Sequence, residues 1–453
     1  MSIATQSLMA QEAALEMTSN NIANANTPGY TRETIVLTEA DVVQQGSVTL
    51  GGGVTLQGLE SVRDQLLNLR IQQQTSQQSS ADAQTGALQQ LQTLFPTTGS
   101  SLATGLSSFF TSLSALSSNP TSLASRQAVL SAGQNLAGEF NTVSSGLSTQ
   151  QSALDQQTVS DVSSINQLSS QIAGLNAQQA QLTGTGENVG SVEDQIGSLE
   201  LKLSQLTNLS VTHTPAGDTL TTGTGTPLVV GGKSYALETT AGANGRQQVL
   251  DGSGTDITSA ISGGDLGGTL AVRDTAIPNL LGQLDSFASQ FAAAINAAQA
   301  KGYDQNGQAG GPLFTVSATV AGAAASIALA TTDPAAIAAS SDGSSGSNGN
   351  LANLAAVATA KLGSGQSPED VSAGLIYQVG SDTATAQAES SAIGLSLTQL
   401  TQQQSSVSGV SIDEESANLI RYQQAYEAAA KIVNTVATLF NVTLNMGTAV
   451  GGS

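Results

Sequence analysis

Residues 411–440 read SIDEESANLIRYQQAYEAAAKIVNTVATLF. Apolar side chains recur in this stretch at alternating steps of three and four residues, which indicates a heptad seam on a helix. The seam consists of Leu419, Tyr422, Tyr426, Ala429, Val433, Val436 and Phe440. Ser411 and Glu414 have the spacing of a capping box, which marks the start of the helix. Because an isolated amphipathic helix cannot bury its own stripe, this helix must pair with another.

The N-terminal residues carry a matching pattern. One apolar row recurs every seven residues at Met1, Leu8, Leu15 and Ile22, and a neighbouring row contains Ile3, Ala10 and Met17. The pattern predicts an amphipathic helix of about six turns. Its stripe can be buried against the C-terminal helix of the same chain or against helices of other chains, and periodicity alone does not choose between them.

The interior of the chain is predicted to be largely helical. The apolar spacing from Leu59 onward predicts a helix that runs to Leu94. Two further segments, 154–182 and 192–206, keep near-heptad spacing, and the Gly-rich stretch 183–191 separates them. Together they predict an αα-hairpin with long arms.

A small β-rich domain is predicted within this helical frame. Thr, Gly and Val dominate between residues 211 and 270, where short alternating runs replace helix formers. We therefore expect a mainly α fold with an inserted β-rich domain: paired terminal helices, a long-helix bundle domain, and the small β domain at the far end. The expected domains are 1–58 with 408–453 (terminal and coiled-coil-like), 59–210 with 271–407 (long helices), and 211–270 (β-rich).

Composition argues against several classes of partner. The 453-residue chain has no Cys, and its net charge is −21 with only 12 Lys and Arg. This charge opposes binding to nucleic acid or to anionic lipid, which both need clustered basic residues. No apolar run is long enough for a transmembrane helix, and the first residues lack the segments of a secretory signal peptide. We expect a protein that is cytoplasmic or that leaves the cell without a cleaved signal.

The sequence offers little catalytic or metal-binding chemistry. His213 is the single histidine, and no nucleophile motif lies near it, which favours an exposed loop histidine. Asp304 and Asn306 have the spacing of a calcium loop, but the sixth position is Ala309 and the twelfth is Thr315, which favours a tight turn. We expect no catalytic, metal-binding or cofactor-binding residues.

Residues 20–30, NNIANANTPGY, mark the end of the N-terminal helix. Pro28 stops the helix and pushes the residue before it toward an extended conformation, and Pro28-Gly29 suits the central positions of a type II turn. Residues 30–37 then alternate as a strand does. One asparagine is enough for a helix cap, whereas this stretch has four of them, at positions 20, 21, 24 and 26.

Residues 19–30, SNNIANANTPGY, resemble the N-terminal signature of the axial proteins of the bacterial flagellum, the family of rod, hook and hook-associated subunits. Residues 408–441 are similar to the C-terminal helix that this family shares. Within the family, residues 30–32, 119–141 and 263–314 resemble the hook-associated subunits of the hook–filament junction. The resemblance implies a structural subunit without catalysis that assembles at the distal end of the hook and joins the hook to the filament. The alternative is another axial subunit, a hook or rod protein.

The resemblance also implies a set of partners. They are a ring of identical subunits, the hook protein, a second hook–filament junction protein, a cytoplasmic export chaperone and the flagellar export apparatus, with no nucleic acid and no membrane. The implied location is the flagellum outside the cell, reached without a cleaved signal peptide. Roughly residues 1–45 and 408–453 are expected to be poorly ordered before assembly, since a lone stripe cannot offset its ordering entropy.

Two groups of residues are then expected to carry assembly. The N-terminal group is Leu8, Leu15, Asn20, Asn21, Ile22, Asn24, Asn26, Pro28, Gly29 and Tyr30. Its asparagines would supply neutral donors and acceptors for subunit contacts. The C-terminal group, which would also bind the chaperone, is Leu419, Tyr422, Tyr426, Val433, Val436 and Phe440.

Overall fold

The computed structural model describes residues 2–45, 48–96, 99, 101–214 and 216–450. Its helices are α1 (Ser2–Asn24), α2 (Gln65–Gln92), α3 (Leu102–Ser118), α4 (Leu123–Thr185), α5 (Gly190–Leu206), α6 (Gly264–Ala271), α7 (Ile277–Gln299), α8 (Ala323–Ser326), α9 (Leu351–Ala356), α10 (Pro368–Ser408) and α11 (Ile412–Val450). Its strands are β1 (Glu33–Glu39), β2 (Val43–Gln45), β3 (Val48–Leu50), β4 (Val54–Ser61), β5 (Leu209–Thr212), β6 (Thr219–Thr222), β7 (Pro227–Val230), β8 (Lys233–Ser234), β9 (Glu238–Ala241), β10 (Gln247–Leu250), β11 (Phe314–Thr315) and β12 (Ala328–Leu329). The fold is mainly α with a small β-rich region, as predicted.

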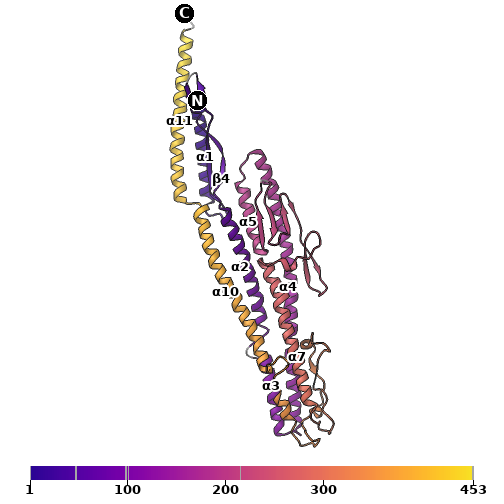
Figure 1. The fold of residues 1–453 in the computed structure, drawn as a ribbon. Coiled ribbons are helices and arrows are strands. Elements are labelled where there is room, and N and C mark those ends of the chain that lie inside the picture. The colour runs from indigo at the N-terminus through magenta and orange to yellow at the C-terminus, as the bar shows by residue number, and fades with distance from the viewer. Residues whose placement is uncertain (1, 46–47, 97–98, 100, 215, 451–453) are drawn as a thin grey trace.

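The terminal helices pair within the chain, at one end of an elongated molecule. α1 and α11 lie side by side, and α1 also packs against β1 and β4 (Figure 1). The buried apolar residues of α1 are Ala10, Ala14 and Met17. The predicted row of Leu8, Leu15 and Ile22 is only half-buried, and Met1 lies outside the described residues. Of the neighbouring row, Ala10 and Met17 are buried but Ile3 is 50% exposed, and the row of Leu8, Leu15 and Ile22 keeps part of its surface free for other contacts.

The C-terminal seam is buried unevenly. Ala429 is buried, whereas Leu419, Tyr422, Val433 and Val436 are half-buried. Tyr426 is 36% exposed and Phe440 is 61% exposed. α11 extends past the start of α1 in Figure 1, so α1 does not cover the last turns of the seam. Ser411 accepts a hydrogen bond from the backbone N–H of Glu414 (3.4 Å), as expected of a cap.

The helix predicted from Leu59 begins later than expected. Residues 54–61 form β4, which pairs antiparallel with β1 from Glu33↔Ser61 to Glu39↔Val54. α2 starts at Gln65, where the Asp64 carboxylate caps the helix by accepting from the N–H of Leu67 (3.0 Å). The prediction was wrong because the apolar residues at the end of β4 also fit a helical spacing, while the cap signal comes only after them. The strand thus crosses the expected domain boundary at 58/59.

The long-helix domain is held by an aromatic core at the end far from the termini. Phe109 of α3, Phe140 of α4 and Phe291 of α7 are fully buried, and Phe314 of β11 joins them. The rings meet mostly edge to face, with centroids 5.6 Å apart between Phe291 and Phe314, which is the favoured geometry for aromatic pairs. α2 and α10 run side by side from the terminal pair toward this core (Figure 1).

The β-rich region does not lie at the far end, contrary to the prediction. Figure 1 shows its strands beside α4 and α5, at the middle of the molecule, whereas α3 and the lower part of α7 form the far end. The region is a four-stranded antiparallel sheet, β5-β6-β7-β8, and the hairpin β9-β10. Its buried Leu220, Leu228 and Val229 share one cluster with Ile165 and Ile172 of α4. The sheet thus covers an apolar side of the αα-hairpin. Residues 264–270, which were expected to belong to the β-rich domain, are part of α6 instead.

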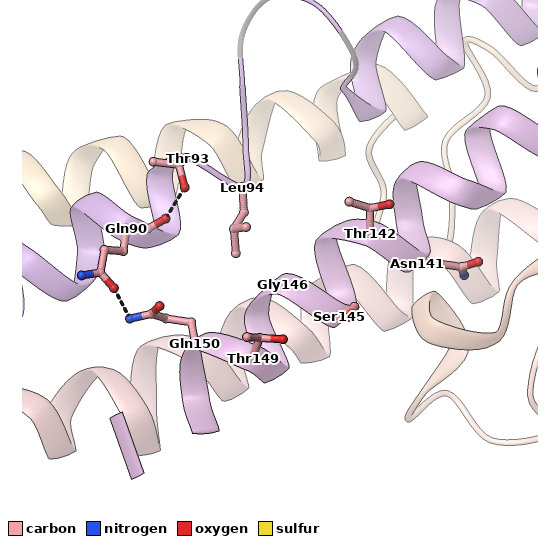
Figure 2. Close-up of a pocket in the computed structure, with 9 residues that line it drawn as sticks. All are labelled: Gln90, Thr93, Leu94, Asn141, Thr142, Ser145, Gly146, Thr149 and Gln150. Atoms are coloured by element: carbon pink, nitrogen blue, oxygen red, sulfur yellow. Dashed lines mark hydrogen bonds between the residues drawn. The ribbon is translucent and has the colours of Figure 1, made fainter. Parts of the chain in front are cut away.

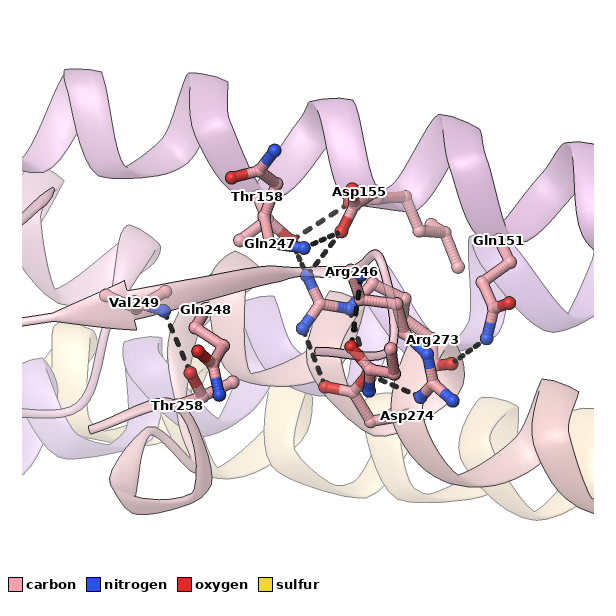
Figure 3. Close-up of polar contacts among 12 residues, drawn as sticks. Gln151, Asp155, Thr158, Arg246, Gln247, Gln248, Val249, Thr258, Arg273 and Asp274 are labelled. Carbon is pink, nitrogen blue, oxygen red and sulfur yellow. Dashed lines mark hydrogen bonds and ion pairs between the residues drawn. The ribbon is translucent and has the colours of Figure 1, made fainter. Parts of the chain in front are cut away.

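One buried arginine ties the β-rich region to the long helices (Figure 3). Arg273 lies in a single π-helical turn between α6 and α7 and is almost fully buried. It donates to Asp155 of α4 (2.9 Å) and pairs with its neighbour Asp274 (2.8 Å). Asp274 also accepts a hydrogen bond from Arg246 (3.1 Å). Asp155 accepts a second one from the backbone N–H of Gln247 at the start of β10 (2.8 Å). The network satisfies the buried charge and fixes the hairpin β9-β10 on α4.

We expect the Arg273→Ala substitution to lower the free energy of unfolding by about 3–5 kcal/mol, because it removes the buried guanidinium that pairs with both Asp155 and Asp274. Urea unfolding followed by circular dichroism measures the change. The matched control is Arg70→Ala, which removes an exposed arginine of α2 and should change stability by less than about 0.5 kcal/mol. Equal losses in the two variants would show that the buried network contributes nothing particular.

Candidate functional site

The chain turns sharply where the terminal helices meet the rest of the molecule. α1 ends at Asn24, and the N–H of Tyr30 donates to the carbonyl of Thr27 (3.2 Å). Gly29 has φ = 83°, which a residue with a side chain rarely adopts. With Pro28 before it, this geometry is a type II turn, as predicted.

Asn21 locks the chain that follows the turn back onto α1. Its side-chain amide donates to the carbonyl of Glu33 (3.0 Å), and its amide oxygen accepts the N–H of Glu33 (3.0 Å) and the hydroxyl of Tyr30 (2.8 Å). Asn21 is fully buried. Burial, with smaller effects from Glu33, Asp194 and Glu415, raises the pKa of Tyr30 to about 12, so the phenol keeps the proton that it donates. Asn21 therefore makes its polar contacts inside the chain, unlike the subunit contacts expected of it.

The other three asparagines are wholly or partly exposed, and Asn20 and Asn24 line a cavity that α4 and α5 also border. Asn24 donates to the side-chain oxygen of Asn20 (2.6 Å) and accepts from the hydroxyl of Thr27 (3.2 Å). Asn20 and Asn26 are exposed. Their position leaves amide groups near the surface, so their part in subunit contacts stays a prediction.

The loop between α4 and α5 and the first turns of α5 bind this turn to the long-helix domain. Asp194 accepts the N–H of Thr31 (3.2 Å) and pairs with Arg63, whose guanidinium lies 2.8 Å away. Arg63 also donates to the carbonyl of Gly190 (2.9 Å), and Asn188 donates to the carboxylate of Glu33 (2.9 Å). We call the contacts made by Arg63, Asn188 and Asp194 the joint clamp.

The connection between α10 and α11 passes the same place. The N–H of Arg32 donates to the carbonyl of Ser408 (3.0 Å), and the N–H of Val62 donates to the carbonyl of Arg32 (2.8 Å). The ion pair between Arg32 and Glu414 (3.1 Å) is largely exposed and adds little. All three connections between the terminal pair and the long helices are therefore bonded to one another. Sequence reasoning missed the joint clamp because its partners are far apart in the chain and carry no local pattern.

The other candidate residues have structural roles. Asp304 accepts from the N–H groups of Asn306 (2.8 Å) and Gln308 (2.7 Å), so residues 302–314 hold the predicted tight turn. His213 is an exposed residue of the loop after β5, as predicted, and its imidazole forms an ion pair with Asp218 (2.7 Å). Among the described residues, no cluster of three or more His, Cys, Asp or Glu could hold a metal ion. No helix in that same part of the chain has the length and apolarity to cross a membrane.

A hollow of about 810 Å³ lies between the end of α2 and α4 (Figure 2). Its lining is Gln90, Thr93, Leu94, Asn141, Thr142, Ser145, Gly146, Thr149 and Gln150. None of these side chains ionises near neutral pH, and Gln150 donates to Gln90 across the hollow (2.6 Å). The lining therefore supplies no general acid, base or charged ligand.

Three protein-family models match separate parts of the chain. Residues 1–31 match a model described as flagella basal body rod protein, and residues 401–446 match flagellar basal body rod FlgEFG protein C-terminal. Residues 88–314 match the model described as flagellar hook-associated protein FlgK helical domain. A flagellar hook-associated protein 1 from Bacillus subtilis is 31% identical, over 99% of this chain and 98% of that protein. The chain belongs to the hook-associated protein 1 family.

Other members of the hook-associated protein 1 family agree with this assignment. The Escherichia coli member is 27% identical, over 98% of each protein. That alignment spans 539 positions, more than the 453 residues of this chain, so the relative has internal segments without a counterpart here. The flagellar hook junction protein FlgK from Burkholderia pseudomallei has the same fold, with a TM-score of 0.69 and 19% identity over 75% of this chain and all of that one.

We expect Asn21→Ala to loosen the joint, because it leaves the buried N–H of Glu33 and the hydroxyl of Tyr30 without their acceptor. Each such group costs about 1–3 kcal/mol. Hydrogen exchange should show faster exchange of the amides at residues 31–35 by at least about tenfold. Asn26→Ala, which removes an exposed amide in the same stretch, serves as the control and should leave these rates unchanged; equal exchange in both variants would contradict the assigned role.

Proposed function

We propose that this chain is a structural subunit of the bacterial flagellum that assembles at the distal end of the hook and joins the hook to the filament. The observation that carries the proposal is the hook-associated helical-domain match over residues 88–314, between two ends that match rod-protein families. The ends alone would equally fit the alternative, a hook or rod subunit. The interior favours the junction.

Assembly would take place through the paired terminal helices. α1 keeps the half-buried row of Leu8, Leu15 and Ile22, and α11 keeps Phe440 largely exposed. A ring of identical subunits would bury these faces between neighbouring helix pairs, which supplies the burial that one chain alone lacks. The exposed amides of Asn20 and Asn26 would add uncharged polar contacts at the turn.

The proposed partners follow from the same surfaces. In the ring, one side would contact the hook protein and the other a second hook–filament junction protein. Before export, a cytoplasmic chaperone would cover α11, whose exposed Ile420, Ile432, Leu439 and Phe440 would otherwise favour self-association. The flagellar export apparatus would then carry the chain out of the cell without a cleaved signal peptide.

We infer that the protein has no catalytic activity. The ion-paired His213 supports this inference, because no serine or cysteine nucleophile is bonded to its imidazole among the described contacts. Membership of a family of structural flagellar proteins points the same way.

A strain that lacks this chain should build hooks and release filament subunits into the medium, because the step between hook and filament is missing. The wild-type gene should restore filaments. The triple variant Leu419→Asp, Val433→Asp and Phe440→Asp should not restore them and should not bind the chaperone, since each charge enters the seam. Electron microscopy of hooks and immunoblots of the medium measure the outcome.

The matched control is the triple variant Gln423→Asp, Gln424→Asp and Asn434→Asp. It adds the same charge at exposed polar positions of α11 and should restore filaments. Loss of the hooks themselves in the deletion strain would favour the alternative hook or rod subunit. Full motility with the seam variant would contradict the assembly mechanism.

In dilute solution, the terminal helices should be the first part of the monomer to be cut by a protease. The reason is that α1 and α11 bury few large side chains until neighbouring subunits cover them. The burial in their pairing therefore offsets little of the conformational entropy lost when the two helices become ordered. Mass spectrometry of timed digests should find early cuts in α1 and α11 and late cuts in α4. Terminal helices as resistant as α4 would rule out coupling of their folding to assembly.

A further inference from the structure

A chain of polar side chains runs from α2 into the β-rich region, directly below the joint clamp. Gln72 of α2 donates to one carboxyl oxygen of Glu200 on α5 (3.0 Å). His213 and Asp218 lie at the two ends of the turn between β5 and β6, where the imidazole Nδ1 is 2.7 Å from the carboxylate of Asp218. Glu200 and Asp218 line the same cavity, and hydrogen bonding to Asp218 is one of the causes that raise the pKa of Glu200.

Glu200 is in an environment that does not suit a carboxylate. It is 3% exposed, and its second oxygen receives no hydrogen bond from any described donor. Burial, and then the charge of Asp218, raise the pKa of Glu200 well above the usual range of a glutamic acid. A protonated Glu200 would resolve both problems, because a neutral carboxyl group suits a buried site and its O–H could donate to Asp218.

Asp218 is held so that it faces both neighbours. Its N–H donates to the side-chain oxygen of Asn176 on α4 (3.1 Å), and the amide of Asn176 donates to the carbonyl of Asp218 (2.8 Å). Asn176 is fully buried. The position of Asp218 between an imidazole and a carboxyl group is therefore fixed by the backbone and by α4.

We propose that Glu200 carries a proton that it donates to Asp218, and that this proton latches the β-rich region onto α2 and α5. With the proton present, an imidazolium, a carboxylate, a carboxylic acid and an amide form an unbroken row of hydrogen bonds across three elements. When the proton leaves, two carboxylates face each other in a buried site, and their repulsion pushes the β5–β6 turn away from α5.

The direction of the pH dependence is the same for both titrating groups. The raised pKa of Glu200 means that its stabilising effect is complete at acidic pH and is lost as the pH rises through that raised value. The hydrogen bond to Asp218 is the main cause that raises the pKa of His213 above 6.5, against the opposing effect of burial. Its contribution is likewise lost as the pH rises, so the latch holds at low pH and opens toward alkaline pH.

The other charged groups at this site belong to the cavity of about 810 Å³ that the latch shares with the joint clamp. They are Arg63, Glu193 and Asp194. Glu193 and Glu200 both raise the pKa of His213 further, while Arg63 is paired with Asp194 (2.8 Å) and Glu193 (3.5 Å). Arg63 thus neutralises the nearby acidic groups Glu193 and Asp194. The remaining charge beside Glu200 and Asp218 is the imidazolium of His213.

The single histidine of the chain makes the test direct, because its NMR signals need no assignment. We expect the imidazole of the wild-type protein to titrate above 6.5, with a second inflection at higher pH when the proton of Glu200 leaves. Glu200→Gln keeps an N–H donor toward Asp218 without a titrating proton, so the second inflection should disappear. Asp218→Asn should shift the imidazole titration downward. Glu187→Gln, an exposed change in the α4–α5 loop, should leave both inflections in place.

A single inflection in the wild type that Glu200→Gln does not alter would overturn the proposal. A measurement on the wild-type protein covers the case in which that variant fails to fold. Glutamate-selective ¹³C labelling should reveal one side-chain carboxyl that is still protonated at neutral pH and ionises only in the alkaline range. If every glutamate is ionised at neutral pH, Glu200 carries no such proton.

Discussion

The pairing of α1 with α11 holds the two ends of the chain together. The segment between them must therefore leave the terminal pair and return to it. The chain leaves α1 through the type II turn and runs out along α2 to the aromatic core. It returns along α4, goes out again along α7, and comes back along α10. Each helix that leaves the terminal pair is thus balanced by one that returns. Small side chains such as Ala10 and Ala14 of α1 and Ala429 of α11 are buried in this part of the molecule, and small buried side chains let neighbouring backbones come close.

The hydrogen bonds of the joint compensate for a scarcity of charge. Only 10% of the residues are charged, and few basic ones are available for ion pairs. Arg63 and Arg273 are used where separate elements meet, and each binds two acidic groups. Elsewhere neutral amides do this work: Asn21 joins α1 to β1, and Asn176 joins α4 to the β5–β6 turn. Amides can satisfy backbone groups on both sides without the desolvation cost of a charge.

Local patterns predicted the elements that depend on local physics. The seam of α11, the stripe of α1, the αα-hairpin and the turn at Pro28 and Gly29 were all evident, because periodicity and turn chemistry act over a few residues. β4 was mistaken for the start of a helix, since an apolar spacing over a few residues fits both periods until a cap such as Asp64 is reached. The place of the β-rich region was also missed, because it depends on which side of α4 is apolar once α5 has folded against it.

The candidate site divides in the same way. The Asn-Pro-Gly stretch was found because it is compact in sequence, but the inward role of Asn21 was not, since its partner Glu33 becomes a neighbour only after the turn has formed. Arg63, Asn188 and Asp194 carry no signal of their own. These three residues come together only because the tip of the αα-hairpin lies against the turn.

The length of α4 gives the joint clamp a mechanical consequence. α4 contains 63 residues and extends for about 95 Å, with one end at the clamp and the other in the aromatic core. A tilt of about 5° at the clamped end would carry the opposite end sideways by about 8 Å over such a length. Arg63 and Asp194 thus hold the point about which α4 would tilt, so a small change in their hydrogen bonds would displace the end of α4 in the aromatic core by several times as much.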